Sequence, residues 1–319
     1  MYFIKLKPAG KDYLWGGTKL KTDYGKNIDL EPLAETWEFS THLDGLSVVD
    51  NGEFKGETLL DFFKQNPNLF GDKFKELSDL PILVKFIDAK NKLSVQVHPD
   101  DDYALKNEKQ NGKTEMWYVL EAEKGAKIVY GFEHDVTAEM IKQSLTDGSI
   151  EKHLHFENVK KGDVFFIPAG MIHGIGEGVV VAEIQENSNL TYRVYDYNRV
   201  DKNGNKRELH VDKALQVLKM KSFNGRIYQN KTITSTPSVL YENLCECQYF
   251  NVKRYVVRGT LEICVKNDSF NVLLCIGGNG IIKGKDSLLE IKKGECVLIP
   301  NGYDEINICG SLEFLKINC

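Results

Sequence analysis

The feature that most constrains this chain is a short stretch at residues 162–173, which follows the pattern G-x5-P-x-G-x2-H. Residues 164–167 within it are strong strand formers, and Pro168 with Gly170 favours a tight turn. His173 is therefore expected to begin a returning strand. The stretch predicts two strands joined by a rigid turn, with an imidazole held just beyond the turn.

Two polar stretches lie upstream of this turn. In the segment Ser-Val-Gln-Val-His, the alternation of a strand places Ser94, Gln96 and His98 on one face. Glu115 shares a face with Trp117, so it is expected to point into an apolar interior, where an unpaired carboxylate is costly. A divalent metal is the economical interpretation of these side chains. The predicted ligands are His98, His173, Glu115 and Gln96.

Each of these residues also has a simpler explanation when taken alone. A lone histidine in a strand is more often a core or surface residue than a ligand, and Glu115 could face solvent at the rim. The combination favours a metal. Two histidines and a carboxylate with open positions also suit non-haem Fe(II). A shell completed by Gln96, with one position left for water or substrate, favours zinc, and we expect one Zn²⁺ per chain.

Local patterns predict a chain of short elements. Cap residues and apolar spacing favour helices that are followed by turn residues. Beyond about residue 225, short alternating strands separated by Gly, Asn or Asp dominate. The helices are predicted at residues 57–65, 100–106, 137–145 and 212–219, with a buried strand at 81–89.

Six stretches spread over the chain carry a family signature. They begin at Trp15 (WGG), Glu35 (ETWEFS), Leu93 (LSVQVHPD), Gly112 (GKTE), Gly162 (the turn) and Gln185 (QENSNLTYRVYDY). Together they resemble the short form of class I mannose-6-phosphate isomerases (phosphomannose isomerases), which are zinc enzymes. The turn itself is similar to the metal motif of cupins, with Gln96 where many cupins carry a first histidine. The resemblance covers essentially the whole chain.

This resemblance implies a mainly β protein of tandem cupin (jelly-roll) barrels, with a few short helices inserted in the first. Residues 294–302 repeat the pattern G-x5-P-x-G, with Glu305 in the place of His173, and no Gln-x-His pair precedes them. Unless that match is a coincidental turn, the second copy is expected to keep the fold and to have lost the metal. We predict a metal-binding domain at residues 1–229 and a metal-free jelly-roll domain at 230–319.

The resemblance also implies an isomerase that interconverts mannose 6-phosphate and fructose 6-phosphate through an enediol. Arg193 lies in a segment similar to the family's active-site arginine, which would stabilise developing negative charge. Lys113 is a candidate for phosphate contact or proton transfer, and Glu183 for a base or a lysine partner. Ser94 is expected to contact the phosphate and Trp15 to lie near the pocket mouth. Salt bridges, a core serine and a simple turn are the structural alternatives.

Composition limits the partners of the chain. A net charge of −5 without a block of Lys or Arg argues against nucleic acid. The absence of an apolar run of about 18 residues argues against a membrane span. The beginning of the sequence lacks the apolar region of a secretory signal, and the cysteines fit reduced thiols, so a cytoplasmic location is expected. We expect a small sugar phosphate as partner and a monomer or weak homodimer.

Two other functions remain open, a sugar-binding cupin without activity and an Fe(II)-dependent cupin oxygenase. Turnover of mannose 6-phosphate that requires zinc would exclude the first, and metal analysis would exclude the second. His153 and His155 have ligand spacing in a strand, but their charged neighbours predict an exposed pair without a metal.

Overall fold

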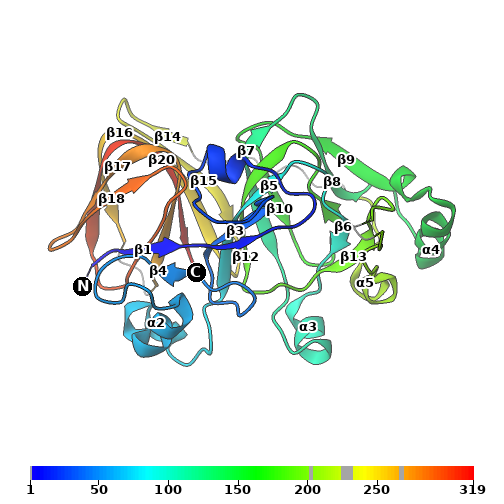
Figure 1. Ribbon diagram of the computed structural model, residues 1–319, viewed down its shortest axis with the longest axis horizontal. Coiled ribbons are helices and arrows are strands. Elements are labelled where there is room, and N and C mark those ends of the chain that lie inside the picture. Colours follow the sequence, from blue (N-terminus) through cyan, green and yellow to red (C-terminus); the bar gives the residue numbers. More distant parts are fainter. Residues whose placement is uncertain (1, 201–203, 224–232, 266–268) are drawn as a thin grey trace.

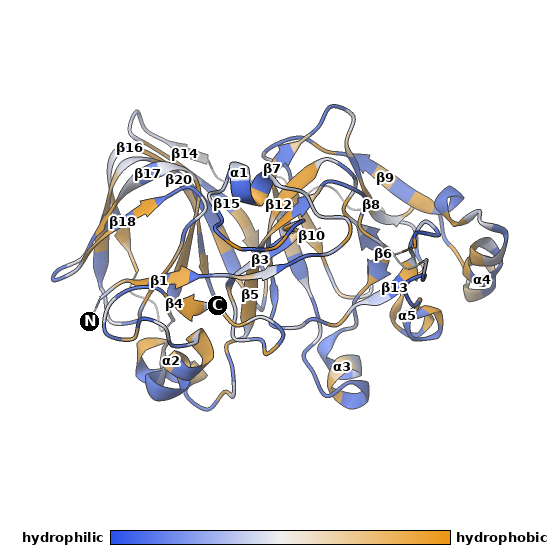
Figure 2. Cartoon of the chain, in the orientation of Figure 1, coloured by the Kyte–Doolittle hydropathy of each residue, from blue (hydrophilic) through white to orange (hydrophobic). Residues whose placement is uncertain are grey.

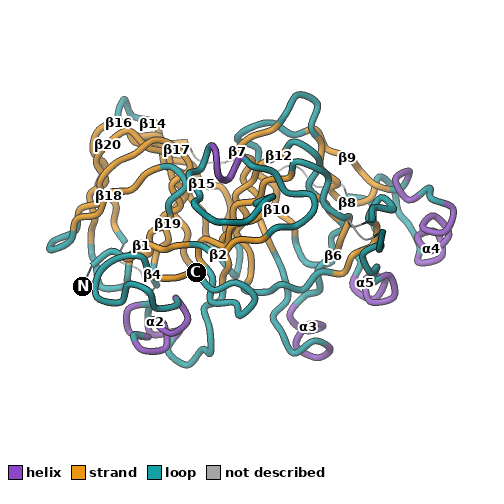
Figure 3. The backbone as a smooth tube through the Cα atoms, viewed as in Figure 1, coloured by secondary structure: helices purple, strands orange, loops and turns teal. Residues whose placement is uncertain are grey.

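Two β-barrels lie side by side in the computed structural model and contain most of the chain (Figure 1). The structure describes residues 2–200, 204–223, 233–265 and 269–319. Strands form the body of both barrels, whereas the helices are short and lie at the outside (Figure 3). The prediction of a mainly β protein with tandem barrels and a few short helices is confirmed.

The first barrel consists of two sheets that face each other across an apolar core. Trp117 and Val181 reach this core from one sheet, and Ile128 and Tyr130 reach it from the other. The six-stranded sheet has the order β10 (Val164–Ile167), β7 (Glu115–Ala122), β12 (Val179–Glu186), β5 (Ile82–Ala89), β3 (Glu35–Phe39) and β2 (Ala9–Lys11). The five-stranded sheet has the order β13 (Tyr192–Tyr195), β6 (Val95–Val97), β11 (His173–Gly174), β8 (Lys127–Phe132) and β9 (Leu154–Asn158).

The second barrel is a single nine-stranded sheet that wraps round its own core. Val257 and Ile263 lie on the same long strand, and both reach one apolar cluster because an even spacing along a strand places them on the same face. The order is β14 (Ile233–Ser235), β15 (Val239–Glu246), β16 (Asn251–Cys264), β20 (Glu305–Asn318), β17 (Asn271–Lys283), β19 (Cys296–Ile299), β1 (Ile4–Lys7) and β4 (Val48–Val49), with β18 (Leu288–Lys292) paired to β17.

The second barrel is completed by strands from the beginning of the chain. β1 pairs antiparallel with β19 on one side and with β4 on the other, so that Ile4 lies opposite Leu298. The predicted boundary between residues 229 and 230 falls outside the described residues, and the division into two domains there stays a proposal. The pairing of β1 with β19 means that the first residues of the chain belong to the second barrel, so the two barrels are not strictly consecutive in sequence.

A shared core joins the two barrels. The outer face of the six-stranded sheet contributes Phe39 and Phe86 to one cluster, and the second barrel contributes Phe270 and Leu315 to the same cluster. The rings of Phe39 and Phe270 stack with their centroids 5.3 Å apart. Figure 2 shows the apolar residues gathered along the strands, with β4 apolar throughout and β12 apolar in its first half. Burial of this common face, at about 25 cal/mol per Å² of apolar surface, holds the barrels together.

The helices begin where their cap residues predict. Thr58, Asp100 and Thr137 each accept a hydrogen bond from the backbone N–H three residues on, and α4 ends at Gly148 in a left-handed conformation. All four predicted helices are therefore confirmed, with ends shifted by one or two residues. None of the helices in the described residues has the length and apolar character needed to cross a membrane. The helices are α1 (Lys19–Thr22), α2 (Leu59–Gln65), α3 (Asp101–Asn107), α4 (Ala138–Asp147) and α5 (Val211–Val217), with 3₁₀ turns at Pro67–Leu69, Asp72–Phe74 and Ile150–Lys152.

Candidate metal centre and active site

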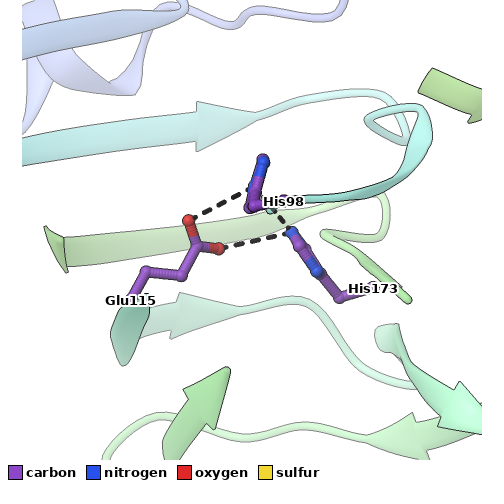
Figure 4. Close-up of side chains that lie close together, drawn as sticks. All are labelled: His98, Glu115 and His173. Carbon is purple, nitrogen blue, oxygen red and sulfur yellow. Dashed lines mark hydrogen bonds and ion pairs between the residues drawn. The ribbon is translucent and has the colours of Figure 1, made fainter. Parts of the chain in front are cut away.

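Three side chains from three strand ends converge in the first barrel (Figure 4). His98 follows β6, Glu115 begins β7 and His173 begins β11. The two Nε2 atoms are 3.1 Å apart, and each lies near one carboxylate oxygen of Glu115, at 3.5 Å for His98 and 3.4 Å for His173. All three residues are buried. The sequence prediction that these residues meet at one point is confirmed.

The predicted turn fixes two of these side chains. β10 ends at Ile167, and Gly170 has φ +85°, a left-handed conformation that favours glycine. The N–H of Gly170 donates to the carbonyl oxygen of His98 at 2.8 Å. A Cβ at Gly170 would lie 2.9 Å from the carbonyl oxygen of Val217, so the turn has no room for a larger residue. The turn thus holds the strands that carry His98 and His173 in register.

Gln96 lies beside this centre. It pairs with His173 across the strands, and its side-chain Nε2 is 3.4 Å from the ring Nε2 of His173. The oxygen and nitrogen of an amide exchange places by rotation about the last side-chain bond. Gln96 can therefore present its oxygen to the point where the three other side chains meet.

The electrostatics of the centre suit a cation. Burial lowers the pKa of His173 to about 4, and burial together with Lys113 and His173 holds that of His98 well below its usual value. Both rings are therefore neutral, which is the form that binds metals. Burial and the neighbouring Glu183 raise the pKa of Glu115 to about 7, which reflects a shortage of positive charge.

Two further observations test whether a metal fits. Oε1 of Glu115 is buried and accepts no hydrogen bond from the described part of the chain. Nδ1 of His173 lies 2.9 Å from the carbonyl oxygen of Met171, which orients the ring and leaves Nε2 free to coordinate. Neutral imidazoles, a carboxylate oxygen without a donor and an amide form a donor set that fits a divalent ion.

A cavity of about 280 Å³ lies beside the centre. Its lining includes polar groups of both signs, which suits a small charged ligand better than an apolar one. Every remaining residue that the sequence predicts to act in catalysis or substrate binding lies in this lining. These residues are Trp15, Ser94, Lys113, Glu183 and Arg193, together with Gln96.

Lys113 and Glu183 form the charged floor of the cavity. Nζ of Lys113 lies 2.8 Å from Oε2 of Glu115 and 3.2 Å from Nε2 of His98. Oε2 of Glu183 accepts a 2.8 Å hydrogen bond from the indole of Trp117. Burial by itself raises the pKa of Glu183, but Lys113, the buried Lys85 and Trp117 outweigh it, so the pKa lies below its usual value. Glu183 is therefore an ionised carboxylate inside the barrel.

Arg193 reaches the same cavity from β13. Its Nη1 donates to the carbonyl oxygen of Glu208 at 2.7 Å, whereas its Nε is buried and has no partner among the described residues. Burial and the nearby Arg207 lower its pKa, although a guanidinium stays charged in any protein. The cavity therefore carries fixed positive charge in addition to the carboxylate of Glu183.

Two charged residues of the cavity lining, Lys85 and Arg207, escaped the sequence analysis. Lys85 is 3% exposed, and its Nζ lies 3.4 Å from both Oε2 of Glu35 and Oε1 of Glu183. A charged residue within the apolar strand 81–89 was the signal that could have found it. Arg207 donates to Asp196 through Nε at 2.8 Å and lies in a polar segment without a pattern.

The remaining predicted groups lie apart from the centre. His153 is 2.9 Å from His134, and His155, on the outer strand β9, pairs with Glu133 and Glu157. Both are half-buried rather than exposed as predicted, because these polar neighbours cover them. Within the described ranges, three metal-binding groups come together only at His98, Glu115 and His173. Glu305 is exposed and pairs with Cys264.

A jelly-roll barrel with two buried histidines and a carboxylate at its centre is a cupin with a metal-capable site. Family models agree, since residues 3–130 match the phosphomannose isomerase type I catalytic domain and residues 241–318 match the mannose-6-phosphate isomerase cupin domain. The chain is 37% identical to mannose-6-phosphate isomerase ManA of Bacillus subtilis over 96% of both proteins. It is 35% identical to the putative mannose-6-phosphate isomerase YvyI of the same organism, over 97% of this chain and 96% of that protein.

Solved structures give the same result. The mannose 6-phosphate isomerase of Bacillus subtilis superimposes with a TM-score of 0.92 at 33% identity, over 99% of each chain. A putative mannosephosphate isomerase from Archaeoglobus fulgidus, at 24% identity and a TM-score of 0.78, shares the fold. The chain belongs to the type I phosphomannose isomerase family and is an isomerase, which confirms the resemblance found in the sequence.

Proposed function

We propose that this protein interconverts mannose 6-phosphate and fructose 6-phosphate with one zinc ion, held by His98, Glu115, His173 and Gln96. The names of its relatives support the reaction. The observation that carries the proposal is a buried donor set beside a cavity that is lined by an ionised carboxylate and by guanidinium groups. We also propose that the ligand is a small sugar phosphate and that the protein is located in the cytoplasm. It would be a monomer or a weak homodimer.

The reaction moves a proton between C1 and C2 of the open sugar, through an enediol that bears negative charge on oxygen. Bound zinc would supply Lewis acidity toward the substrate oxygens O1 and O2. Arg193 would stabilise the same charge with a preorganised guanidinium. Glu183, whose carboxylate accepts a hydrogen bond from Trp117, would take and return the proton, and Lys113, which lies beside Glu115, would donate to an oxygen.

The substrate phosphate needs a positive site with hydrogen-bond donors. Arg207 and Arg193 both line the cavity, and Ser94 adds a hydroxyl on the same wall. Trp15 lies in the lining near Tyr13, where the two rings are 5.5 Å apart. We propose that these groups hold the phosphate and cover the sugar, which leaves C1 and C2 toward the centre.

The test is turnover of mannose 6-phosphate by the purified protein, coupled to detection of fructose 6-phosphate. Activity should disappear after treatment with a chelator and return with about one equivalent of Zn²⁺. A protein that binds the sugar without turnover would be a sugar-binding cupin. Activity that requires Fe²⁺ and consumes oxygen would identify an oxygenase, and either result would refute the proposal.

A further inference from the structure

The two barrels place charged residues at corresponding positions. In the first barrel β12 lies between β5 and β7, and Glu183 lies opposite Lys85. In the second barrel β20 lies between β16 and β17, and Lys316 lies opposite Lys253. The position that holds a carboxylate in the first barrel therefore holds a second lysine in the other.

The strand register supports this correspondence at a second place. Glu115 lies opposite Ile167, the last residue before the turn of the first barrel. Asn271 lies opposite Ile299, the last residue before the repeated turn. Asn271 is completely buried, and its Oδ1 has no hydrogen-bond partner in the described part of the chain. The position of the metal-binding carboxylate is thus occupied by an amide that cannot replace a ligand charge.

The charges differ between the two barrels. Lys85 lies 3.4 Å from Glu183 and forms a buried ion pair. Lys316 is only 5% exposed, and neither it nor Lys253 makes an ion pair with any described residue. Burial and Lys253 lower the pKa of Lys316 to about 8, because two like charges face each other in a poorly hydrated place. Lys253 and Lys316 therefore lack a negatively charged partner among the described residues.

The surroundings of the pair open toward solvent along aromatic rings. Lys316 shares its strand face with Phe314, which lies in the core of the second barrel. Phe314 stacks on Tyr255 at 5.2 Å, and Tyr255 stacks on Tyr241 at 5.2 Å. Nζ of Lys253 lies 5.7 Å from the ring of Tyr241. Both tyrosines are half-buried, so their outer parts can be reached from solvent.

We propose that the second barrel has a binding site for a phosphate group, held between Lys253 and Lys316 with the buried amide of Asn271 nearby. Tyr241 and Tyr255 would contact the rest of a phosphorylated ligand. The site is separate from the metal centre and does not depend on the proposed isomerase reaction. Inorganic phosphate and a sugar phosphate share the recognised group, so both are used as probes.

The test is the number of ligands bound by the full zinc-loaded protein, measured by equilibrium dialysis with labelled fructose 6-phosphate. The wild-type protein should bind two equivalents, one in each barrel. Lys316→Met should bind one and keep kcat within about twofold, because it removes a charge far from the metal ligands. Lys283→Met, an exposed lysine on the same strand as Asn271, is the matched control and should bind two.

Lys253→Met provides a second variant, since its side chain is half-buried and its loss leaves the core intact. It should weaken the second site at least about tenfold, as expected for the loss of one charged contact. Competition of inorganic phosphate with labelled fructose 6-phosphate shows which of the two ligands the second site prefers. Equal affinity would assign the site to free phosphate, and tighter binding of the sugar phosphate would assign it to a sugar phosphate. A Lys316→Met protein that binds as many equivalents as the wild type would overturn the proposal, whatever number the first barrel binds.

Discussion

The side chains around the centre differ in what each can give to a metal. His98, His173 and Glu115 are fully buried and point at one another, whereas Gln96 offers a neutral amide from the edge. We predict that alanine at any of the first three removes most zinc and nearly all turnover, because the remaining groups cannot close a tetrahedral shell. Gln96→Ala should weaken metal binding only about tenfold.

Metal analysis of dialysed protein and turnover in the same samples test this order. Glu305→Ala is the control, because this exposed residue occupies the corresponding turn in the second barrel and should leave zinc content unchanged. An active Glu115→Ala protein with nearly stoichiometric zinc would refute the assignment.

Arg193 acts on charge rather than on the metal. We predict that Arg193→Ala keeps its zinc but lowers kcat by roughly two to four orders of magnitude, about 3 to 5 kcal/mol, the scale of losing one preorganised donor to an oxyanion. Arg193→Lys should restore activity only in part, since a point charge cannot reproduce the planar fork. Separate measurement of kcat and KM with excess zinc is decisive. A raised KM with unchanged kcat would mean that Arg193 only holds the phosphate.

The metal ligands could be predicted from sequence because strand alternation and a tight turn are local rules. Ser94, Gln96 and His98 share a face whatever lies elsewhere in the fold. The role of Lys85 could not be found in this way, because its partners Glu35 and Glu183 lie far away along the chain. Arg207 was missed because it lies in a polar segment without strand alternation. An ion pair between distant strands leaves no local pattern, only a charge where an apolar residue is expected.

The contribution of single glycines to the turn at residues 162–173 can also be tested. Gly170 and Gly162 both have positive φ, but only Gly170 has a backbone carbonyl 2.9 Å from the place of a Cβ, whereas Gly162 faces open space. We predict that Gly162→Ala costs about 1 kcal/mol of unfolding free energy through backbone strain alone. Gly170→Ala should cost more and should weaken zinc binding, because the turn must shift between His98 and His173.

Thermal unfolding and zinc titration of the two variants provide the measurement. Equal losses of stability, with unchanged zinc affinity for both, would show that the close contact with Val217 does not hold the centre.

The helices with good caps could be predicted to within two residues, since Thr58 and Thr137 define the beginning of their helices through local hydrogen bonds. The short strands β1 and β4 could not, because two to four residues acquire a strand conformation only from their partners.

The barrels share one core, so they should unfold together. All three tryptophans, at positions 15, 37 and 117, belong to the first half of the chain, and their fluorescence reports on the first barrel. We predict that Phe314→Ala, which opens a cavity in the core of the second barrel, costs about 3 to 5 kcal/mol. The tryptophan transition in urea should move by the same amount as the far-UV circular dichroism transition.

Phe156→Ala on the outer strand β9 is the control, since this half-buried ring lies in the first barrel. It shows how tryptophan fluorescence and circular dichroism respond when the substitution is in the first barrel. A tryptophan transition that stays in place in Phe314→Ala while circular dichroism changes would show that the two barrels are independent. It would also favour the division of the chain near residue 230.

The partnership of β1 with β19 has a consequence for the making of the protein. Ribosomes add about 5 to 20 residues per second, so Ile4 waits roughly 15 to 60 s before Leu298 has been made. During translation only β4 is present to pair with this first strand, and the edge that later pairs with β19, which includes Ile4 and Leu6, has no partner. On a crowded polysome, the nearest finished β19 belongs to the chain ahead. We therefore expect strand exchange between successive nascent chains to be the characteristic assembly error of this topology.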